Sequence, residues 1–177
     1  KPILDSLGID KNKPKKQQRN QTGSPILEEG DILLNTTLAE TSDWQQVDLP
    51  VVSTLRHFCI ETLSSYTEDN QACISEVDLL DDKGQPIDKT KWEVVYISSE
   101  QADKNLGVAE NLFDGDISSF WHTDPATEPG QPHRIIVDIK EIYKISALRF
   151  KVRKGAFLSG KVKEINVYGR PQFFLFH

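Results

Sequence analysis

The chain has 177 residues, a length that suits one globular domain with an appendage. Hydrophobic residues make up 37% of it and charged residues 27%, which is enough apolar material for one core but not for two large ones. The net charge of −6 argues against a nucleic-acid-binding surface, which needs a basic face, and no apolar run approaches the roughly 18–20 residues that span a bilayer.

Residues 1–30 differ in composition from the rest of the chain. The stretch from Pro14 to Ser24 is polar, basic and nearly free of apolar residues, so it cannot bury enough surface to offset the entropy of ordering. We therefore predict that residues 1–30 are a linker or the end of an upstream domain, and that residues 31–177 form the folded module. A plain tail and a tether to another domain both remain open, and we favour the tether.

Short β-like runs of alternating apolar and polar residues follow from residue 44, at intervals of about 10–20 residues. The predicted strands are Phe58–Leu63, Ile74–Leu80, Trp92–Ile97, Arg134–Ile139, Ile145–Arg153 and Val162–Tyr168. No helical periodicity longer than about two turns and no internal repeat accompanies them. Many short strands joined by Gly, Pro and Asp turns predict an all-β fold, an antiparallel β-sandwich.

The final Phe173–Phe176 is too apolar for a free tail. We expect it to add an edge strand or to pack on the sandwich, and contact with a partner or a membrane is the alternative. Cys59 and Cys73 both lie in predicted strands. A single disulfide and two free thiols are both open, and we favour free thiols.

Residues 110–123 are the most informative stretch. An Asp-Gly-Asp turn over residues 114–116 is followed five residues later by Trp121, His122 and Thr123. A tight acidic turn can hold a cation, and the aromatic that follows can anchor the turn to a sheet. Nothing there resembles a nucleophile paired with a base, and the acidic pairs elsewhere in the chain have the composition of turns or linker. The stretch favours a binding module over an enzyme.

Four linked segments resemble one known family. They are Asn111–Thr123, Pro132–Ile139, Ile145–Arg153 and Gly160–Tyr168. Together they are similar to the discoidin domain, also called the coagulation-factor (F5/8) type C domain, whose sugar-binding branch is carbohydrate-binding module family 32. The resemblance covers residues 92–169 with matching order and spacing. It implies a jelly-roll sandwich of the galactose-binding-domain-like type.

Two earlier segments, Arg56–Ser65 and Ala72–Leu80, look like the last two strands of the same family. In this chain they come first, so the strand order resembles a permuted version of the family's. Permutation is physically reasonable because the termini of a sandwich often lie close together. Alternatively, residues 44–90 finish one domain and residues 92–177 begin another. A lone half-sandwich exposes a sheet face, so we favour one complete domain.

The resemblance implies a structural cation, usually Ca²⁺, held by the acidic turn. Carried over position by position, the ligands are the side chains of Asp114, Asp116, Ser119 and Glu76 with the backbone carbonyls of Asn111 and Ser75. Calcium takes six to eight oxygen ligands, and carboxylates, carbonyls and a hydroxyl supply that chemistry. The alternative is a plain Asp turn with Glu76 as a solvated strand residue.

The resemblance also implies a sugar site. In sugar-binding relatives a His after the Trp and an Arg ending the long strand hydrogen-bond sugar hydroxyls, and these positions correspond to His122 and Arg153. The chain lacks the family's aromatic shortly after Thr123 and the Asn after the Arg. We expect Phe157 and Ser159 to replace them. Alternatively, His122 caps its loop and Arg153 is a surface charge.

These inferences predict a non-catalytic carbohydrate-binding module with a structural Ca²⁺ site, attached to a glycan-active enzyme or surface protein. It would bind a galactose-type or other glycan, with no nucleic-acid partner, in an extracellular, periplasmic or cell-surface setting. One alternative is a structural or protein-interaction sandwich without a sugar site. Another is a membrane-surface discoidin domain that uses the apolar loop at residues 155–159, although the net negative charge disfavours anionic lipid unless calcium bridges it.

Overall fold

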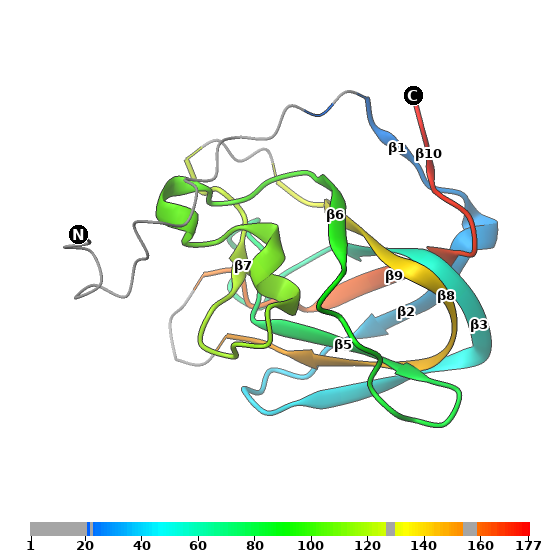
Figure 1. Cartoon of the computed structure of the whole chain (residues 1–177). Helices are drawn as coiled ribbons and strands as arrows, with labels where there is room; N and C mark the ends of the chain where they lie inside the picture. The colour runs from blue at the N-terminus through cyan, green and yellow to red at the C-terminus, as the bar shows by residue number, and fades with distance from the viewer. Residues whose placement is uncertain (1–20, 22, 127–129, 154–158) are drawn as a thin grey trace, which may run out of the picture.

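The structure is a computed structural model that describes residues 21, 23–126, 130–153 and 159–177 (Figure 1). Its strands and 3₁₀ helices are, in chain order, β1 (Pro25–Ile26), η2 (Glu29–Asp31), β2 (Ile32–Thr37), β3 (Gln45–Thr62), β4 (Cys73–Ile74), β5 (Glu76–Asp81), β6 (Glu93–Ile97), η3 (Asp103–Asn105), η4 (Ala109–Phe113), β7 (Trp121–His122), β8 (His133–Lys151), β9 (Glu164–Arg170) and β10 (Leu175–Phe176). The named strands pair antiparallel. The predicted all-β class is confirmed.

Two layers share the long strands β3 and β8, which pair with each other over most of their lengths. In the first layer the second half of β3 also pairs with β9, which pairs with β2, and the first half of β8 pairs with β6. In the second layer the other half of β8 lies between β5 and the first half of β3. Figure 1 shows β3 and β8 curving together where one layer passes into the other. The result is the predicted β-sandwich.

The structure corrects the sequence prediction of the strands at residues 134–153. The sequence predicts two strands, Arg134–Ile139 and Ile145–Arg153, whereas the structure joins most of both in β8. The register against β3 shifts between Leu55 and His57, and Lys140 has a φ of 73°. A bulge of this kind bends a strand pair without ending it, so the break in alternation near residue 140 is a bend and not a turn.

Alternation along the strands decides which side chains fill the core. Phe58 and Ile60 of β3 join the large cluster between the layers, whereas Cys59 belongs to a second cluster on the outer face. Trp121 is fully buried in the large cluster, which confirms the prediction that it anchors the core. Burying a large apolar side chain stabilises a fold by roughly 1.5–3 kcal/mol. Trp121 therefore holds the segment after the acidic turn firmly against the sheet.

The ends of the described chain cover the outer face of the first layer. Cys59, Ile136 and Tyr168 of this face pack against Phe174, and Leu27 and Phe176 lie around them. β1 pairs with β10 beside this cluster. The predicted packing of the C-terminal aromatic segment is therefore confirmed.

The prediction that residues 1–30 are a linker concerns mainly residues outside the described part, and the boundary at residue 31 stays a prediction. Pro25–Ile26, on the linker side of that boundary, form β1. Cys59 and Cys73 are both buried and free, so no disulfide joins them. Burial raises the pKa of the Cys73 thiol to about 12 and raises that of Cys59 as well, which keeps both as neutral thiols. No helix in the described ranges has the length and apolarity to cross a membrane.

Candidate functional site

The acidic turn follows η4 and is shaped by hydrogen bonds within itself. Gly115 has a φ of 82° with open space where a Cβ would lie, so the chain reverses here at the residue that tolerates this conformation best. Asp114 Oδ1 accepts the Asp116 N–H at 2.9 Å, and Asp114 Oδ2 accepts the Ser119 hydroxyl at 2.5 Å. Three of the predicted ligands are thus already drawn together in the turn.

Two further contacts fix the turn from inside. Asp116 Oδ1 accepts the N–H and the hydroxyl of Ser118 at 2.9 and 2.6 Å. The Ser118 hydroxyl and N–H hold the pKa of Asp116 below its usual range, so this carboxylate stays ionised. The side chain of Asn111 is buried and donates to the Phe120 carbonyl at 3.0 Å, which closes the loop. The amide is therefore structural, and only the Asn111 carbonyl is left as a candidate ligand.

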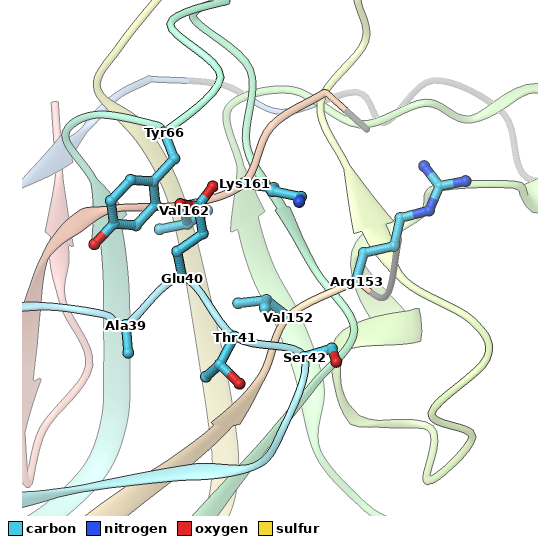
Figure 2. A pocket seen from close by; sticks show the side chains of 9 residues that line it. All are labelled: Ala39, Glu40, Thr41, Ser42, Tyr66, Val152, Arg153, Lys161 and Val162. Atoms are coloured by element: carbon cyan, nitrogen blue, oxygen red, sulfur yellow. The ribbon is translucent and has the colours of Figure 1, made fainter. Parts of the chain in front are cut away.

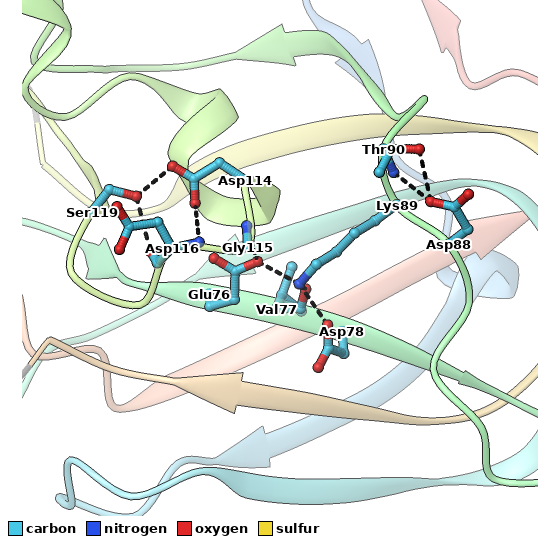
Figure 3. A network of polar contacts seen from close by, with 10 residues as sticks. All are labelled: Glu76, Val77, Asp78, Asp88, Lys89, Thr90, Asp114, Gly115, Asp116 and Ser119. Atoms are coloured by element: carbon cyan, nitrogen blue, oxygen red, sulfur yellow. Dashed lines mark hydrogen bonds and ion pairs between the residues drawn. The ribbon is translucent and has the colours of Figure 1, made fainter.

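Glu76 comes to the turn from β5, as predicted from the resemblance. Its Oε2 accepts the Gly115 N–H at 3.0 Å and also pairs with the Lys89 ammonium (Figure 3). Glu76 is 1% exposed, and its second oxygen, Oε1, has no hydrogen-bond partner among the described residues. Burial raises the pKa of Glu76 to about 7, against the opposing effect of Lys89 and the Gly115 N–H. The site therefore holds a buried carboxylate oxygen that lacks a partner.

The predicted ligand set is brought together only in part. Ser75 lies immediately before Glu76, and its N–H bonds the Lys151 carbonyl at 2.8 Å. Within the described residues no three His, Cys, Asp or Glu side chains gather as a metal-binding group. Glu76 meets the turn at the Gly115 backbone, and Asp114 and Asp116 bond to their own turn.

Among the predicted sugar-binding residues, His122 and Ser159 lie in contact. His122 is buried in β7, and its Nε2 lies 2.7 Å from the Ser159 hydroxyl oxygen. Its Nδ1 lies 2.5 Å from the Thr123 carbonyl, which has no proton to give, so Nδ1 donates and Nε2 accepts from Ser159. Both ring nitrogens are engaged. His122 orients Ser159, and the exposed Ser159 oxygen is the group left for a ligand.

Arg153 lies just beyond β8 and has a different support. Its guanidinium carbon is 4.0 Å from the centroid of the Phe120 ring, a cation–π distance. Phe120 is itself buried at 9% exposure and lies edge-on to the His122 ring at 6.3 Å. Phe120 thus links the supports of Arg153 and Ser159. Phe157, the fourth predicted residue, lies outside the described part of the chain.

A pocket of about 260 Å³ adjoins the backbone of Arg153. Its walls are Ala39, Glu40, Thr41, Ser42, Tyr66, Val152, Arg153, Lys161 and Val162. Two hydrogen bonds hold the walls in place. The Tyr66 hydroxyl donates to the Leu38 carbonyl at 2.7 Å, and Lys151 Nζ donates to the Ser42 carbonyl at 2.5 Å. Figure 2 shows the Arg153 guanidinium pointing away from Tyr66 and Glu40. The guanidinium therefore lies on the Phe120 ring and does not point into the pocket.

Sequence reasoning missed two contributors, Lys89 and Phe120. Phe120 is buried, and nothing in the sequence signals that its ring supports Arg153. Lys89 belongs to the loop after β5, which folds back so that the Ile87 N–H bonds the Leu79 carbonyl at 3.0 Å. This return places Lys89 beside Glu76, and no sequence motif predicts that contact.

Comparisons with known proteins bear on the same stretch. Residues 95–172 match the F5/8 type C domain. A sialidase from Micromonospora viridifaciens is 32% identical over 84 residues, which are 46% of this chain and 13% of the sialidase. The chain thus matches only a small part of that protein's length. The resemblance drawn from the sequence is confirmed, because residues 95–172 match the model of the F5/8 type C, or discoidin, domain.

Proposed function

We propose that this chain is a non-catalytic carbohydrate-binding module attached to a glycan-active enzyme or surface protein. The observation that supports this best is the arrangement around Phe120, where an aromatic ring carries the Arg153 guanidinium and His122 holds an exposed Ser159 hydroxyl. A planar five-donor group beside a hydroxyl suits a vicinal diol, because both can engage neighbouring sugar oxygens. The similarity to part of a sialidase, whose name indicates a glycan-active enzyme, adds support.

The proposal gives the chain a tethering role. One or two sugar units on an open loop surface bind weakly, and attachment to a second domain raises the effective concentration. The module would keep its partner domain close to glycans of a galactose type or another class. Such glycans are found outside the cytoplasm, so we propose an extracellular, periplasmic or cell-surface setting.

A glycan array in the presence of calcium tests this role. We expect binding to a coherent set of sugars that is lost in Arg153→Ala, with a melting temperature within about 2 °C of the unchanged protein, because Arg153 is only partly buried and lies outside the hydrophobic core. A blank array from folded protein would favour the structural or protein-interaction role instead. Co-sedimentation with phosphatidylserine vesicles in calcium would favour the membrane role.

We also propose a structural Ca²⁺ at the acidic turn. The proposal is supported by Glu76 Oε1, which has no partner in the part of the chain that the structure describes. It is also supported by oxygens of the kind calcium prefers, namely those of Asp114, Asp116 and Ser119 with the Asn111 and Ser75 carbonyls. When bound, the ion supplies positive charge that links the turn to β5. Residues Asp114 and Asp116 hold the turn in shape, and Glu76 presents its free oxygen from the sheet.

The chain offers a matched pair of variants for this test. Asp116 and Asp88 each accept the N–H and the hydroxyl of the residue two positions later. The distances are 2.9 and 2.6 Å for Asp116. They are 2.9 and 2.8 Å for Asp88, whose contacts with Thr90 appear in Figure 3. Asp116→Ala should abolish calcium binding in a calorimetric titration, and Asp88→Ala should leave it intact. Equal calcium binding by both variants would refute the site.

A further inference from the structure

Lys89 occupies an unusual position for a lysine, because its ammonium is surrounded by oxygens. Nζ pairs with Glu76 Oε2, lies 2.5 Å from Asp78 Oδ1 and donates to the Val77 carbonyl at 3.1 Å (Figure 3). An ammonium has three donors, so all three are used. The Lys89 side chain is 18% exposed, and those of Glu76 and Asp78 are 1% and 15% exposed.

The charge balance explains why a cation is needed there. Glu76 and Asp78 lie two residues apart in β5, so their side chains extend from the same face of the strand toward Lys89. The negative charge of Asp114 adds a further repulsion to Glu76. A buried carboxylate without a nearby positive charge is costly. The three oxygens around Nζ, two from carboxylates and one from a carbonyl, are also of the kind that a calcium ion takes.

We infer that Lys89 is an internal cation of the acidic site, which stabilises Glu76 when calcium is absent and weakens calcium binding when it is present. This inference rests on the proposed calcium site. Lys89 holds Glu76 through Oε2, and Oε1 has no partner within the described ranges, so the ammonium and the metal ion share one carboxylate. Lys89 makes the fold tolerant of calcium loss, and calcium becomes a modulator of stability instead of a requirement.

Two opposite effects follow from removing the ammonium. Calcium affinity should rise, because a positive charge that repels the ion from a few ångströms away is gone. Stability without calcium should fall, because Glu76 and Asp78 are left near each other with no counter-charge. If Lys89 only stabilised the local structure, its removal would lower stability without changing the calcium affinity.

Lys89→Met tests both effects, with Lys140→Met as the matched control. Lys140 also lies between two carboxylates, 3.2 Å from Glu93 and 3.8 Å from Asp138, but away from the acidic turn. In calorimetric titrations we expect calcium to bind Lys89→Met about tenfold more tightly than the unchanged protein or Lys140→Met. In thermal unfolding, a chelator should lower the melting temperature of Lys89→Met by roughly 5 °C or more and that of the unchanged protein by less than half as much.

The outcomes separate this inference from the calcium proposal. Calcium binding that is unchanged by Lys89→Met overturns the inference and leaves the calcium site standing. No calcium binding by any variant overturns both. If Lys89→Met does not fold without calcium but folds when calcium is added, the inference holds. If it fails to fold in both conditions, Lys89→Gln replaces it in the same titration, and unchanged affinity in that variant overturns the inference.

Discussion

The acidic turn and the Arg153 loop, by which we mean Arg153 and Ser159 with their supports Phe120 and His122, satisfy their polar groups in opposite ways. The turn is built from carboxylates that bond to their own backbone, and beside it one buried oxygen, Glu76 Oε1, has no partner among the described residues. The loop carries a cation on an aromatic ring and a hydroxyl held by a buried histidine. The first arrangement offers carboxylate oxygens and suits a metal ion, and the second offers directed donors and suits a polyol. Calcium and glycan binding should therefore be separable by mutation.

Two glycines with positive φ, one in each region, give the largest expected contrast. Gly160 follows Ser159 with a φ of 75°, and a Cβ there would lie 3.0 Å from the backbone of Ala72 and Cys73. Gly115 has a φ of 82° in open space. Gly160→Ala should cost about 2–3 kcal/mol, because strain and contact add, and Gly115→Ala only about 1 kcal/mol from the conformation alone. Urea unfolding measures both losses of unfolding free energy. Equal losses would mean that the backbone at residue 160 shifts away from Ala72 and Cys73 at no cost.

A pair of serine variants should show that the two functions are independent. Ser159→Ala removes the hydroxyl held by His122, so glycan affinity should fall about fivefold, the equivalent of the roughly 1 kcal/mol of one hydrogen bond. Ser119→Ala removes the hydroxyl bonded to Asp114, so calcium affinity should fall by a similar factor. Titrations of each variant with both ligands check this. If either variant weakened both ligands equally, the two regions would form one coupled site.

The smallest expected effect concerns pH and lies outside both regions. His57 is buried, and its Nδ1 accepts the Phe174 N–H at 3.1 Å, so burial lowers the pKa of His57 despite the neighbouring Asp138, with Arg56, Arg170 and Lys140 adding to the shift. A lowered histidine pKa means that the unfolded chain binds the proton first. Stability should therefore fall as pH drops through about 6.5, by at most about 1.4 kcal/mol per pH unit, the ceiling for one proton.

His57→Asn keeps an acceptor for the Phe174 N–H and removes the titration. Its free energy of unfolding should therefore decline less than that of the unchanged protein between pH 7 and pH 5.5. Equal declines in the two proteins would show that His57 does not carry the pH dependence.

The sequence predicted the fold well where alternation is regular. The strands containing Phe58 and Ile74 were found from the period of two, because one face of each is buried. The sequence missed β2 and the first half of β3, where many side chains are partly or fully exposed and the pattern is weak. It also divided β8, because a bulge and a turn interrupt alternation in the same way.

The candidate sites were predictable in part. The resemblance to the discoidin family pointed to Glu76 and His122, and in the structure Glu76 meets the acidic turn at the Gly115 N–H. The resemblance could not show that His122 is buried with both nitrogens engaged, since that depends on the distant Ser159. Lys89 reaches Glu76 only through the path of a loop, and a lysine in a polar loop has no distinguishing pattern. Contacts made by long side chains across separate loops are therefore the part that sequence periodicity does not encode.

The most direct test of the proposed function is a calorimetric titration of the array-selected glycan into the unchanged protein and into Arg153→Lys. Lysine keeps the positive charge but lacks the planar fork that lies on Phe120 and can bond two sugar oxygens at once. We predict that Arg153→Lys binds the glycan at least about tenfold more weakly, a loss of roughly 1.4 kcal/mol, while its calcium affinity is unchanged. Equal glycan affinity in the two proteins would contradict a sugar site built on Arg153.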